Sequence, residues 1–390
     1  MNIAFFSECW DPQINGVVTS TKALAGALPP DRHTVHVFAP RYPGYQDEFD
    51  RIFRQWAVKY FFQPEFYFSS PLPFAALRQA RKWRIDLVHL HSEFTLGMVA
   101  SQVARRLGIP SVLTLHTLWE FYSHYFMWGL VPLSLFRHFL SMIYRLPDYF
   151  IAPSEKAERY LVDIMGVKKP IAIIPTGIKL DMFHQARLTA AERAARRAVY
   201  GLGPDDFVLM FAGRVGKEKA LSVLMDGVAA LLPAHPRLRL MIVGSGPYLE
   251  HYRRYARSRG LERAVVFTGY RPYEEMPLMY RMADAFAIAS VSETQGLVTV
   301  EALASDLPVI VKNDPASLDI IDRGRHGLIF STTREFSAAV ERLIRDHDLR
   351  RRLAAEARAG SLRYGDEAYG RAVGDFYDWV VKDYRSTRRG

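Results

Sequence analysis

Two glutamates eight residues apart stand out as side chains that can bind a polar ligand. They lie in the stretch Ser292–Leu303, where Glu293 precedes Gly296 and Glu301 follows it. Gly296 permits a tight turn, and the amides after it would form a helix N-terminus, which attracts anions. The pair can therefore contact different parts of one elongated ligand. Taken alone, two such glutamates could equally be surface residues at a solvated helix start.

A second group combines cations with glycine. Gly213, Arg214 and Lys219 directly follow the apolar run 207–212. Gly213 allows the backbone to approach a ligand closely, while Arg214 offers a bidentate fork and Lys219 a point charge, a combination that suits a diphosphate. A surface charge cluster is the alternative interpretation. Gly244 begins a similar turn after the run 238–243, but one glycine turn is weak evidence because many strands end in one.

The N-terminal half offers an anion-binding turn and two histidines. Asn15 and Gly16 lie just before a helical pattern, where free amides can meet an anion. The loop is too long for the GxGxxG fingerprint and lacks its first two glycines, which argues against a nicotinamide or flavin oxidoreductase. His91 and His116 each follow an apolar run. Neither has a third ligand at a metal-binding spacing, so we predict no metal site.

The elements that must position these residues are short apolar runs alternating with helical stretches. Continuous apolar strands imply burial on both faces, hence parallel sheets covered by helices. We expect strands at 2–6, 33–39, 85–89, 112–115, 149–152, 171–174, 207–212, 238–243, 264–268, 285–289 and 308–311. Helices are expected at 19–28, 97–107 and 155–165, and in the C-terminal tail.

This pattern predicts two doubly wound α/β domains. The first comprises residues 1–183 and the second residues 184–365, because the Arg-rich stretch 183–204 contains no strand and the pattern restarts after it. Residues 366–390 form a helix expected to cross back to the first domain. Ligands bind beyond the carboxyl ends of parallel strands, so two such domains facing each other would enclose a cleft.

Composition narrows the class of protein and its location. The 390 residues are 49% hydrophobic and 24% charged, an ordinary globular composition. No apolar run reaches the roughly 18–20 residues that span a bilayer, and no signal peptide is recognisable. The single cysteine, Cys9, excludes an intramolecular disulfide. We therefore expect a cytoplasmic protein.

The charge balance points to an anionic partner. The net charge is +10 and is spread over both halves. An Arg-rich genome would explain this equally well. Otherwise the partner is a nucleotide diphosphate, nucleic acid or an anionic membrane. We exclude nucleic acid because no zinc-finger, basic-zipper or RNA-binding signature is present.

In their order along the chain these motifs resemble those of retaining glycosyltransferases of family 4, which have the GT-B fold of two facing Rossmann-like domains. The resemblance covers nearly the whole chain. It rests on residues 15–17, Thr114 and His116, residues 174–178, Gly213 to Lys219, residues 243–247, residues 267–270 and the pair Glu293 and Glu301. Ala220 departs from the family pattern, in which Gly or Asn often follows the Glu-Lys pair.

The resemblance implies a role for each candidate residue. Arg214 and Lys219 would contact the donor diphosphate, and Glu301 the ribose hydroxyls. As catalytic residues, Glu293 would lie near the transferred sugar and His116 near the reacting centre. The remaining donor contacts are Gly16, Gly213, Gly244, Tyr270, Gln295, Gly296 and Leu297. The nucleotide sugar is a substrate, so no cofactor is expected, and no convincing Asp-x-Asp suggests a metal.

The acceptor is less clearly encoded. Nine aromatic residues lie between Phe53 and Phe74, and no acidic residue occurs between Glu120 and Asp148. Aromatic and basic residues without acids suit an interfacial helix, expected at 121–147, on an anionic bilayer. The alternative is an insertion buried against the first domain. Residues 7–12 and 116–125 also resemble the bacterial diacylglycerol glucosyltransferases.

Three hypotheses therefore remain open. The first is a peripheral enzyme on the inner face of the cell membrane. It would transfer a hexose, glucose in this branch, from a UDP sugar to a lipid such as 1,2-diacylglycerol. The second is a transferase with a soluble sugar or metabolite acceptor. The third is a nucleotide-sugar epimerase of the same fold or a binding protein without transfer activity. The sequence leaves the oligomeric state open.

Overall fold

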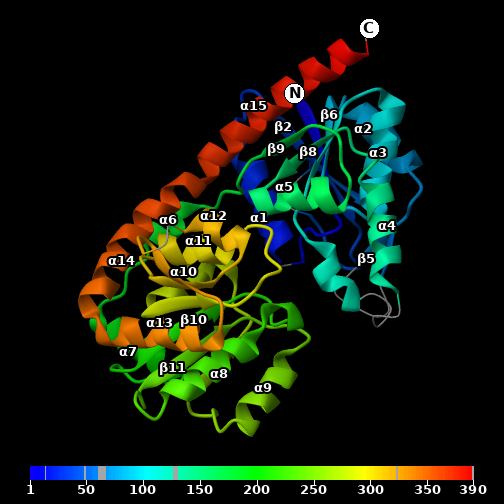
Figure 1. Cartoon of the computed structure of the whole chain (residues 1–390). Helices are drawn as coiled ribbons and strands as arrows, with labels where there is room; N and C mark the ends of the chain where they lie inside the picture. The colour runs from blue at the N-terminus through cyan, green and yellow to red at the C-terminus, as the bar shows by residue number, and fades with distance from the viewer. Residues whose placement is uncertain (14, 48–49, 60–66, 126–130, 322–323, 389–390) are drawn as a thin grey trace. The chain divides into compact units, whose positions relative to one another are not determined.

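The computed structural model describes residues 1–390 except 14, 48–49, 60–66, 126–130, 322–323 and 389–390. Its internal contacts divide the chain into two units. The first consists of Met1–Gly177 together with Asp366–Gly390, and the second of Ile178–Gly365. Each unit contains one large parallel sheet with helices against it (Figure 1), which confirms the predicted α/β class with two Rossmann-like sheets.

Among the described residues, the sheet of the first unit has seven strands in the order β3-β2-β1-β6-β7-β8-β9. These strands are β1 (Asn2–Phe6), β2 (Thr34–Pro40), β3 (Ile52–Gln55), β6 (Leu87–Leu90), β7 (Ser111–Thr114), β8 (Tyr149–Ala152) and β9 (Ile171–Ile173). The connecting helices include α1 (Gly16–Ala27), α2 (Phe74–Lys82), α3 (Thr95–Leu107), α4 (Leu133–Ile143) and α5 (Glu155–Arg159). Strand order reverses between β1 and β6, the point where such sheets bind ligands.

The sheet of the second unit has six strands in the order β12-β11-β10-β13-β14-β15. These strands are β10 (Phe207–Ala212), β11 (Leu238–Val243), β12 (Val265–Gly269), β13 (Ala285–Ile288), β14 (Val309–Lys312) and β15 (Gly327–Phe330). The helices include α6 (Leu180–Gln185), α7 (Ala190–Val199), α8 (Leu221–Leu231), α9 (Leu249–Ser258), α10 (Met276–Arg281), α11 (Leu297–Ala304), α12 (Pro315–Ile320), α13 (Thr333–Arg345) and α14 (His347–Ser361). Here the order reverses between β10 and β13.

All the strands expected from the sequence are present, within two residues of the expected bounds. Strands β3 and β15 were not predicted, nor was the short antiparallel pair β4 (Ala57–Lys59) and β5 (Tyr67–Ser69). All four are edge or two-stranded elements. The first three, β3, β4 and β5, contain polar residues and lack the continuous apolar run of a central strand, whereas β15 is a short apolar run that was missed. The helix expected at 155–165 is α5 followed by a π-helical turn, Tyr160–Ile164.

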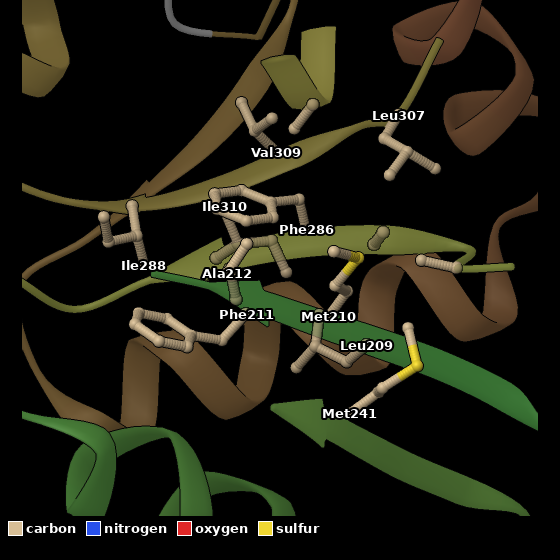
Figure 2. Packing of buried hydrophobic residues seen from close by; sticks show 14 of the residues in the cluster. Leu209, Met210, Phe211, Ala212, Met241, Phe286, Ile288, Leu307, Val309 and Ile310 are labelled. Atoms are coloured by element: carbon tan, nitrogen blue, oxygen red, sulfur yellow. The ribbon is translucent and has the colours of Figure 1, made fainter. Parts of the chain in front are cut away.

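The core of the second unit surrounds β10. Leu209, Met210 and Phe211 of this strand are fully buried, and Phe286 and Ile310 of the next two strands lie beside them (Figure 2). Because both faces of this six-residue apolar strand are buried, the strand cannot slide in the sheet, and the point where the following loop begins is fixed. The position of Gly213 is therefore set by the core.

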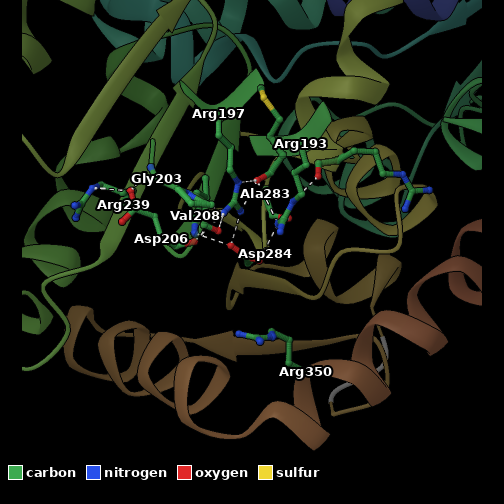
Figure 3. A network of polar contacts seen from close by, with 12 residues as sticks. Arg193, Arg197, Gly203, Asp206, Val208, Arg239, Ala283, Asp284 and Arg350 are labelled. Carbon is green, nitrogen blue, oxygen red and sulfur yellow. Dashed lines mark hydrogen bonds and ion pairs between the residues drawn. The ribbon is translucent and has the colours of Figure 1, made fainter. Parts of the chain in front are cut away.

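A buried ion network fastens the Arg-rich connector to this sheet. Arg197 of α7, 1% exposed, donates to Asp284 at 2.8 Å, and Arg193 donates to the same carboxylate at 2.8 Å (Figure 3). Asp284 also accepts from the backbone N–H of Val208 at 2.8 Å. Because a buried charge is tolerated only when paired and hydrogen-bonded, these contacts tie α7 to the starts of β10 and β13.

The boundary between the two units differs from the sequence-based prediction. Residues 178–183 were assigned to the first domain, but Ile178, Leu180 and Phe183 are buried in the core of the second unit. The final helix, α15 (Asp366–Thr387), belongs to the first unit. Its residues Val373 and Tyr377 are fully buried in a cluster with Leu24 of α1.

Candidate functional site

The loops after β10, β11 and β12 are joined through their backbones. The amide of Gly213 donates to the carbonyl of Val243 at 3.0 Å, and that of Gly244 donates to Gly269 at 2.9 Å. Both Gly213 and Gly244 have a φ of 137°, which disfavours any residue with a side chain. A Cβ on Gly244 would lie 1.9 Å from the carbonyl oxygen of Gly213. Glycine at these positions is thus a steric requirement of the paired loops.

Two predicted site residues meet where the strand order reverses in the second unit. Lys219 follows β10 and Glu293 follows β13, the neighbouring strand. The Lys219 Nζ donates to the Glu293 Oε1 at 2.5 Å, and both side chains are less than one-fifth exposed. This contact brings together the two motifs identified separately in the sequence. A partly buried charge pair of this kind holds both side chains in place at the ligand-binding edge.

Arg214 lies in the same loop and contacts Glu218 at a longer distance. The Arg214 Nη1 is 3.8 Å from the Glu218 Oε1. The Arg214 side chain is 31% exposed, whereas the Glu218 side chain is buried. Glu218 therefore limits how far the guanidinium can swing away from the loop. The guanidinium therefore lies at the carboxyl end of β10, where a phosphate could accept from it.

The second carboxylate of the Glu pair has a different environment. Glu301, in the middle of α11, is buried, and the hydroxyl of Tyr280 in α10 donates to its Oε2 at 2.8 Å. Burial raises the pKa of Glu301 to about 7. The sequence offered no sign of Tyr280 as a partner, because the contact joins two helices 21 residues apart. Glu293 and Glu301 thus differ in burial and in hydrogen-bond partner.

The predicted amide donors lie at the start of α11. Gly296 is the N-cap of this helix with a φ of 96°, and Leu297 is its first residue. Gln295 is buried just before the cap. Tyr270, predicted to lie beside the base, follows β12 and is nearly half exposed. These residues line the edge formed by the Gly213 and Gly244 loops because all follow parallel strands of one sheet.

Gly16 and His116 belong to the first unit, whereas the other predicted residues belong to the second. Gly16 is the exposed first residue of α1, and the Asn15 Oδ1 caps this helix by accepting from the Val18 amide at 3.0 Å. His116 follows β7 and is half-buried. Its Nε2 lies 3.0 Å from the Nδ1 of His91, so the structure brings the two predicted histidines together.

Two buried glutamates of the first unit were missed by sequence reasoning. The Glu8 Oε1 accepts from the Thr95 hydroxyl at 2.5 Å and from the Leu96 amide at 2.9 Å, which caps α3. Glu93 is 3% exposed, and the Tyr144 hydroxyl donates to its Oε1 at 3.3 Å. Burial raises the pKa of Glu8 and raises that of Glu93 to about 8. Only their place after β1 and β6 could have signalled them.

The interfacial helix expected at 121–147 is not one helix. The structure has a 3₁₀ helix at Trp119–Tyr125 and then α4, while residues 126–130 lie outside the described part of the chain. Phe136, an aromatic residue of this stretch that could have served as a membrane anchor, is buried. Arg137 donates to the Glu120 Oε2 at 2.9 Å. Pro132 cannot lie in a continuous helix, which explains the break.

Helix α4 is apolar on two faces. Phe136, Leu140 and Ile143 are buried, whereas Leu135, Phe139 and Met142, at the same spacing, are exposed by 59%, 44% and 53%. We refer to these three exposed residues as the outer face of α4. Next to the end of the helix is a cavity of about 280 Å³ whose lining includes Arg145, Lys168 and Lys169.

A second group of exposed apolar residues lies within the predicted aromatic stretch 53–74. Trp56, Val58, Leu72 and Phe74 are all about half exposed or more. Residues 60–66 of that stretch lie outside the described residues, including four of its nine aromatics.

The structure also bears on metal binding and on membrane-spanning helices. Among the described residues, no group of three or more His, Cys, Asp and Glu side chains could hold a metal ion. Within the same residues, no helix combines the length and apolar character needed to cross a bilayer.

Comparisons with known proteins identify the family to which the chain is similar. The sequence model of Glycosyltransferase Family 4 matches residues 14–182, and that of Glycosyl transferases group 1 matches residues 192–360. An alpha-monoglucosyldiacylglycerol synthase of Streptococcus pneumoniae is 30% identical over 97% of this chain and 85% of its own length. Its namesake in Acholeplasma laidlawii is 29% identical over the full length of both chains.

A solved structure supports the fold. The Anabaena protein HepE in complex with UDP-glucose superposes with a TM-score of 0.78, covering 97% of this chain and 99% of its own. The two sequences are 17% identical, so this likeness shows the arrangement of strands and helices alone.

Proposed function

This chain belongs to glycosyltransferase family 4 and has the GT-B fold, and from that premise we propose a specific reaction. The enzyme transfers glucose from UDP-glucose to a membrane lipid such as 1,2-diacylglycerol, with retention at the anomeric carbon. The observation that carries the proposal is the end-to-end similarity to two relatives that are named for monoglucosyldiacylglycerol synthesis. The UDP-glucose bound to HepE supports the choice of donor.

In this proposal the second unit binds the donor. Departure of UDP concentrates negative charge on the β-phosphate oxygen. Arg214, Lys219 and the amides at Gly296 supply fixed positive potential where that charge develops, the most effective use of charge in catalysis. Glu301 accepts from the ribose hydroxyls, and the backbone at Gly269 and Tyr270 contacts the base.

Retention follows from attack on the same face that the leaving group occupies. The departing phosphate accepts the proton of the acceptor hydroxyl, so no separate protein base is required at that step. Glu293 and His116 hold the sugar while the bond to the phosphate breaks and the bond to the acceptor oxygen forms. The pairing of Glu293 with Lys219 supports this role, because it keeps the carboxylate beside the phosphate-binding cation.

The lipid acceptor and the membrane surface are supported by the first unit. The outer face of α4 offers Leu135, Phe139 and Met142 to an apolar phase. Arg145 and two lysines line the adjacent cavity without an acidic residue, which suits anionic head groups at the inner face of the cell membrane. An interfacial apolar face flanked by cations is typical of peripheral proteins.

The test is a transfer assay with radiolabelled UDP-glucose. The purified protein is mixed with vesicles containing diacylglycerol, or with soluble sugars and sugar phosphates. We expect label in the lipid phase, an α-linked product by NMR, and full activity in EDTA. Transfer only to a soluble acceptor would contradict the lipid proposal. Activity lost in EDTA and restored by Mg²⁺ would contradict the role given to Arg214 and Lys219.

A further inference from the structure

The first unit contains a chain of buried imidazoles that the proposed mechanism uses only at its end. His89 lies in β6, His91 follows that strand, and His116 follows β7 beside it. The rings of His89 and His91 are 4.0 Å apart, and those of His91 and His116 are 5.3 Å apart and nearly parallel. His116 is the half-buried member, whereas the other two are buried.

His89 is fully satisfied within the fold. Its Nδ1 lies 2.5 Å from the hydroxyl of Tyr377, and its Nε2 lies 2.7 Å from the hydroxyl of Thr114. Both partners can donate or accept, so His89 needs nothing from its neighbours. It therefore has a structural role, joining β6 to β7 and to the final helix.

His91 is in a different situation. Its Nδ1 lies 3.0 Å from the His116 Nε2, whereas its own Nε2 is buried and has no hydrogen-bond partner among the described residues. Two ring nitrogens at this distance share one proton, so one ring donates and the other accepts. Burial lowers the pKa of His91 well below its usual value and that of His116 to about 4. Both rings are therefore neutral at pH 7.

The unpartnered nitrogen decides which ring donates. If His91 accepted at Nδ1, its proton would sit on Nε2 as a buried N–H without an acceptor. If His91 donates at Nδ1, Nε2 is a bare lone pair, and buried acceptors without a partner are tolerated more often than buried donors. His91 then donates, His116 accepts at Nε2, and the proton of His116 is on Nδ1.

We propose that His91 is a positioning residue that fixes the ring plane and the tautomer of His116. His116 then offers its Nδ1–H as an uncharged donor to an oxygen of the sugar or the acceptor. The inference rests on the proposed function only in placing His116 near the reacting centre. His91 is itself held rigidly, since its amide donates to the Phe6 carbonyl at 2.8 Å and its ring contacts the edge of Phe5 at 4.6 Å.

The direct test is NMR of protein labelled with ¹⁵N-histidine, which reports which ring nitrogen carries the proton. We expect the Nδ1–H form for His116 in the wild type and a mixture of tautomers in His91→Leu. His91→Asn restores the Nδ1–H form, because the asparagine amide can place an N–H near the position of Nδ1. His91→Gln extends further and should not restore it. An unchanged His116 spectrum in His91→Leu would overturn the proposal.

Kinetics supply the second readout. His91→Leu should lower kcat by about 10–100-fold with donor KM changed less than about twofold, and His91→Asn should recover most of the loss. Tyr377→Phe is the matched control, since it removes a hydrogen bond to His89 and leaves the His91–His116 contact intact. It should lower the melting temperature without lowering kcat. Equal kcat losses in both variants at equal stability loss would reduce His91 to a structural residue.

The two readouts separate this inference from the proposed function. The tautomer is measured on the free enzyme, so it decides the position of the proton even if no lipid acceptor is found. A wild type with the expected tautomer but no transfer to any acceptor contradicts the proposed function. A wild type that transfers glucose with His116 in the Nε2–H form contradicts the role of His91 instead.

Discussion

The two units of this chain differ in what lies at the carboxyl ends of their parallel strands. In the second unit two glycine loops pair through their backbones: Gly213 and Gly244 lie against each other, and their amides donate to neighbouring loops. In the first unit the residues after β6 and β7 are joined through side chains: His91 and Glu93 are buried, and half-buried His116 contacts the ring of His91. In the proposed function, the amides of the second unit bind the donor phosphates and the side chains of the first unit bind the acceptor.

The largest expected effect concerns the cations of the second unit. Lys219→Ala and Arg214→Ala should each lower the transfer rate by about 10²–10³-fold. Each variant lacks a cation that stabilises the negative charge developing on the leaving diphosphate. Lys217→Ala removes an exposed lysine of the same turn and should leave the rate within about twofold of the wild type. Rates are compared at saturating lipid. If all three variants were equally active, the second unit would not bind the donor in this way.

The next prediction tests whether backbone contacts hold the donor loops. Gly244→Ala places a Cβ against the Gly213 carbonyl at a φ that alanine avoids, so we expect a loss of about 2–4 kcal/mol in the free energy of unfolding and weaker UDP binding. Gly260→Ala is the control, since Gly260 also has a positive φ but no atom within 4 Å of an added Cβ. It should cost about 1 kcal/mol and leave UDP affinity unchanged. Urea unfolding and calorimetric titration measure the two quantities.

A third prediction uses pH to separate the contribution of Glu301 to donor binding from that of the backbone amides, which do not titrate. The pKa of Glu301 is raised to about 7, and the ionised carboxylate accepts ribose hydroxyls better than the acid does. Donor KM should therefore fall by up to about tenfold as pH rises from 6 to 8. Glu301→Gln should show a higher donor KM without this dependence, measured at several pH values. A pH dependence that persists in the variant would assign it to another group.

The same shift has a consequence for stability. The folded-state pKa of Glu301 lies above its ordinary value of 4.5, so between those two values the folded protein holds a proton that the unfolded chain releases. The contribution of Glu301 to stability is therefore greatest below pH 4.5 and is lost as pH rises to about 7. Glu301→Gln should unfold less readily than the wild type at pH 8 in the absence of donor.

Substitutions in the first unit should have a smaller effect, which is on binding to membranes. Phe139→Ser and Met142→Ser on the outer face of α4, combined with Arg145→Glu, should reduce binding to anionic vesicles, each basic residue contributing about 1 kcal/mol before screening by salt. Hydrolysis of UDP-glucose without acceptor should not change. Arg137→Glu should matter less because Arg137 already pairs with Glu120. Sedimentation measures binding. Equal binding of wild type and variant would favour a soluble acceptor.

The contrast between the units also explains what could be predicted from the sequence. The eleven predicted strands, the glycine turns and the Glu293–Glu301 pair are local signals, and each lies where expected, whereas the edge strands β3 and β15 and the β4–β5 pair were missed. Lys219 contacts Glu293 because β10 and β13 are neighbours in the sheet. The order of strands in a sheet cannot be read from the spacing of residues in the sequence. Tyr280 beside Glu301, Tyr144 beside Glu93 and Arg197 beside Asp284 are contacts between distant segments. Such partners depend on packing, which no spacing rule encodes.

The smallest expected effect is at Ala220, the position where the donor loop departs from the family pattern. Ala220 has a φ of 48°, a left-handed conformation that costs about 1–2 kcal/mol for a residue with a Cβ. Ala220→Gly removes this strain but makes the unfolded chain more flexible, which costs about 0.4–1 kcal/mol. The net gain should be about 0.5 kcal/mol, seen as a small rise in the urea midpoint with an unchanged slope. Because Ala220 follows Lys219 directly, unchanged UDP affinity would show that the turn is held by its backbone contacts, whereas weaker affinity would show that the alanine side chain helps to hold the lysine.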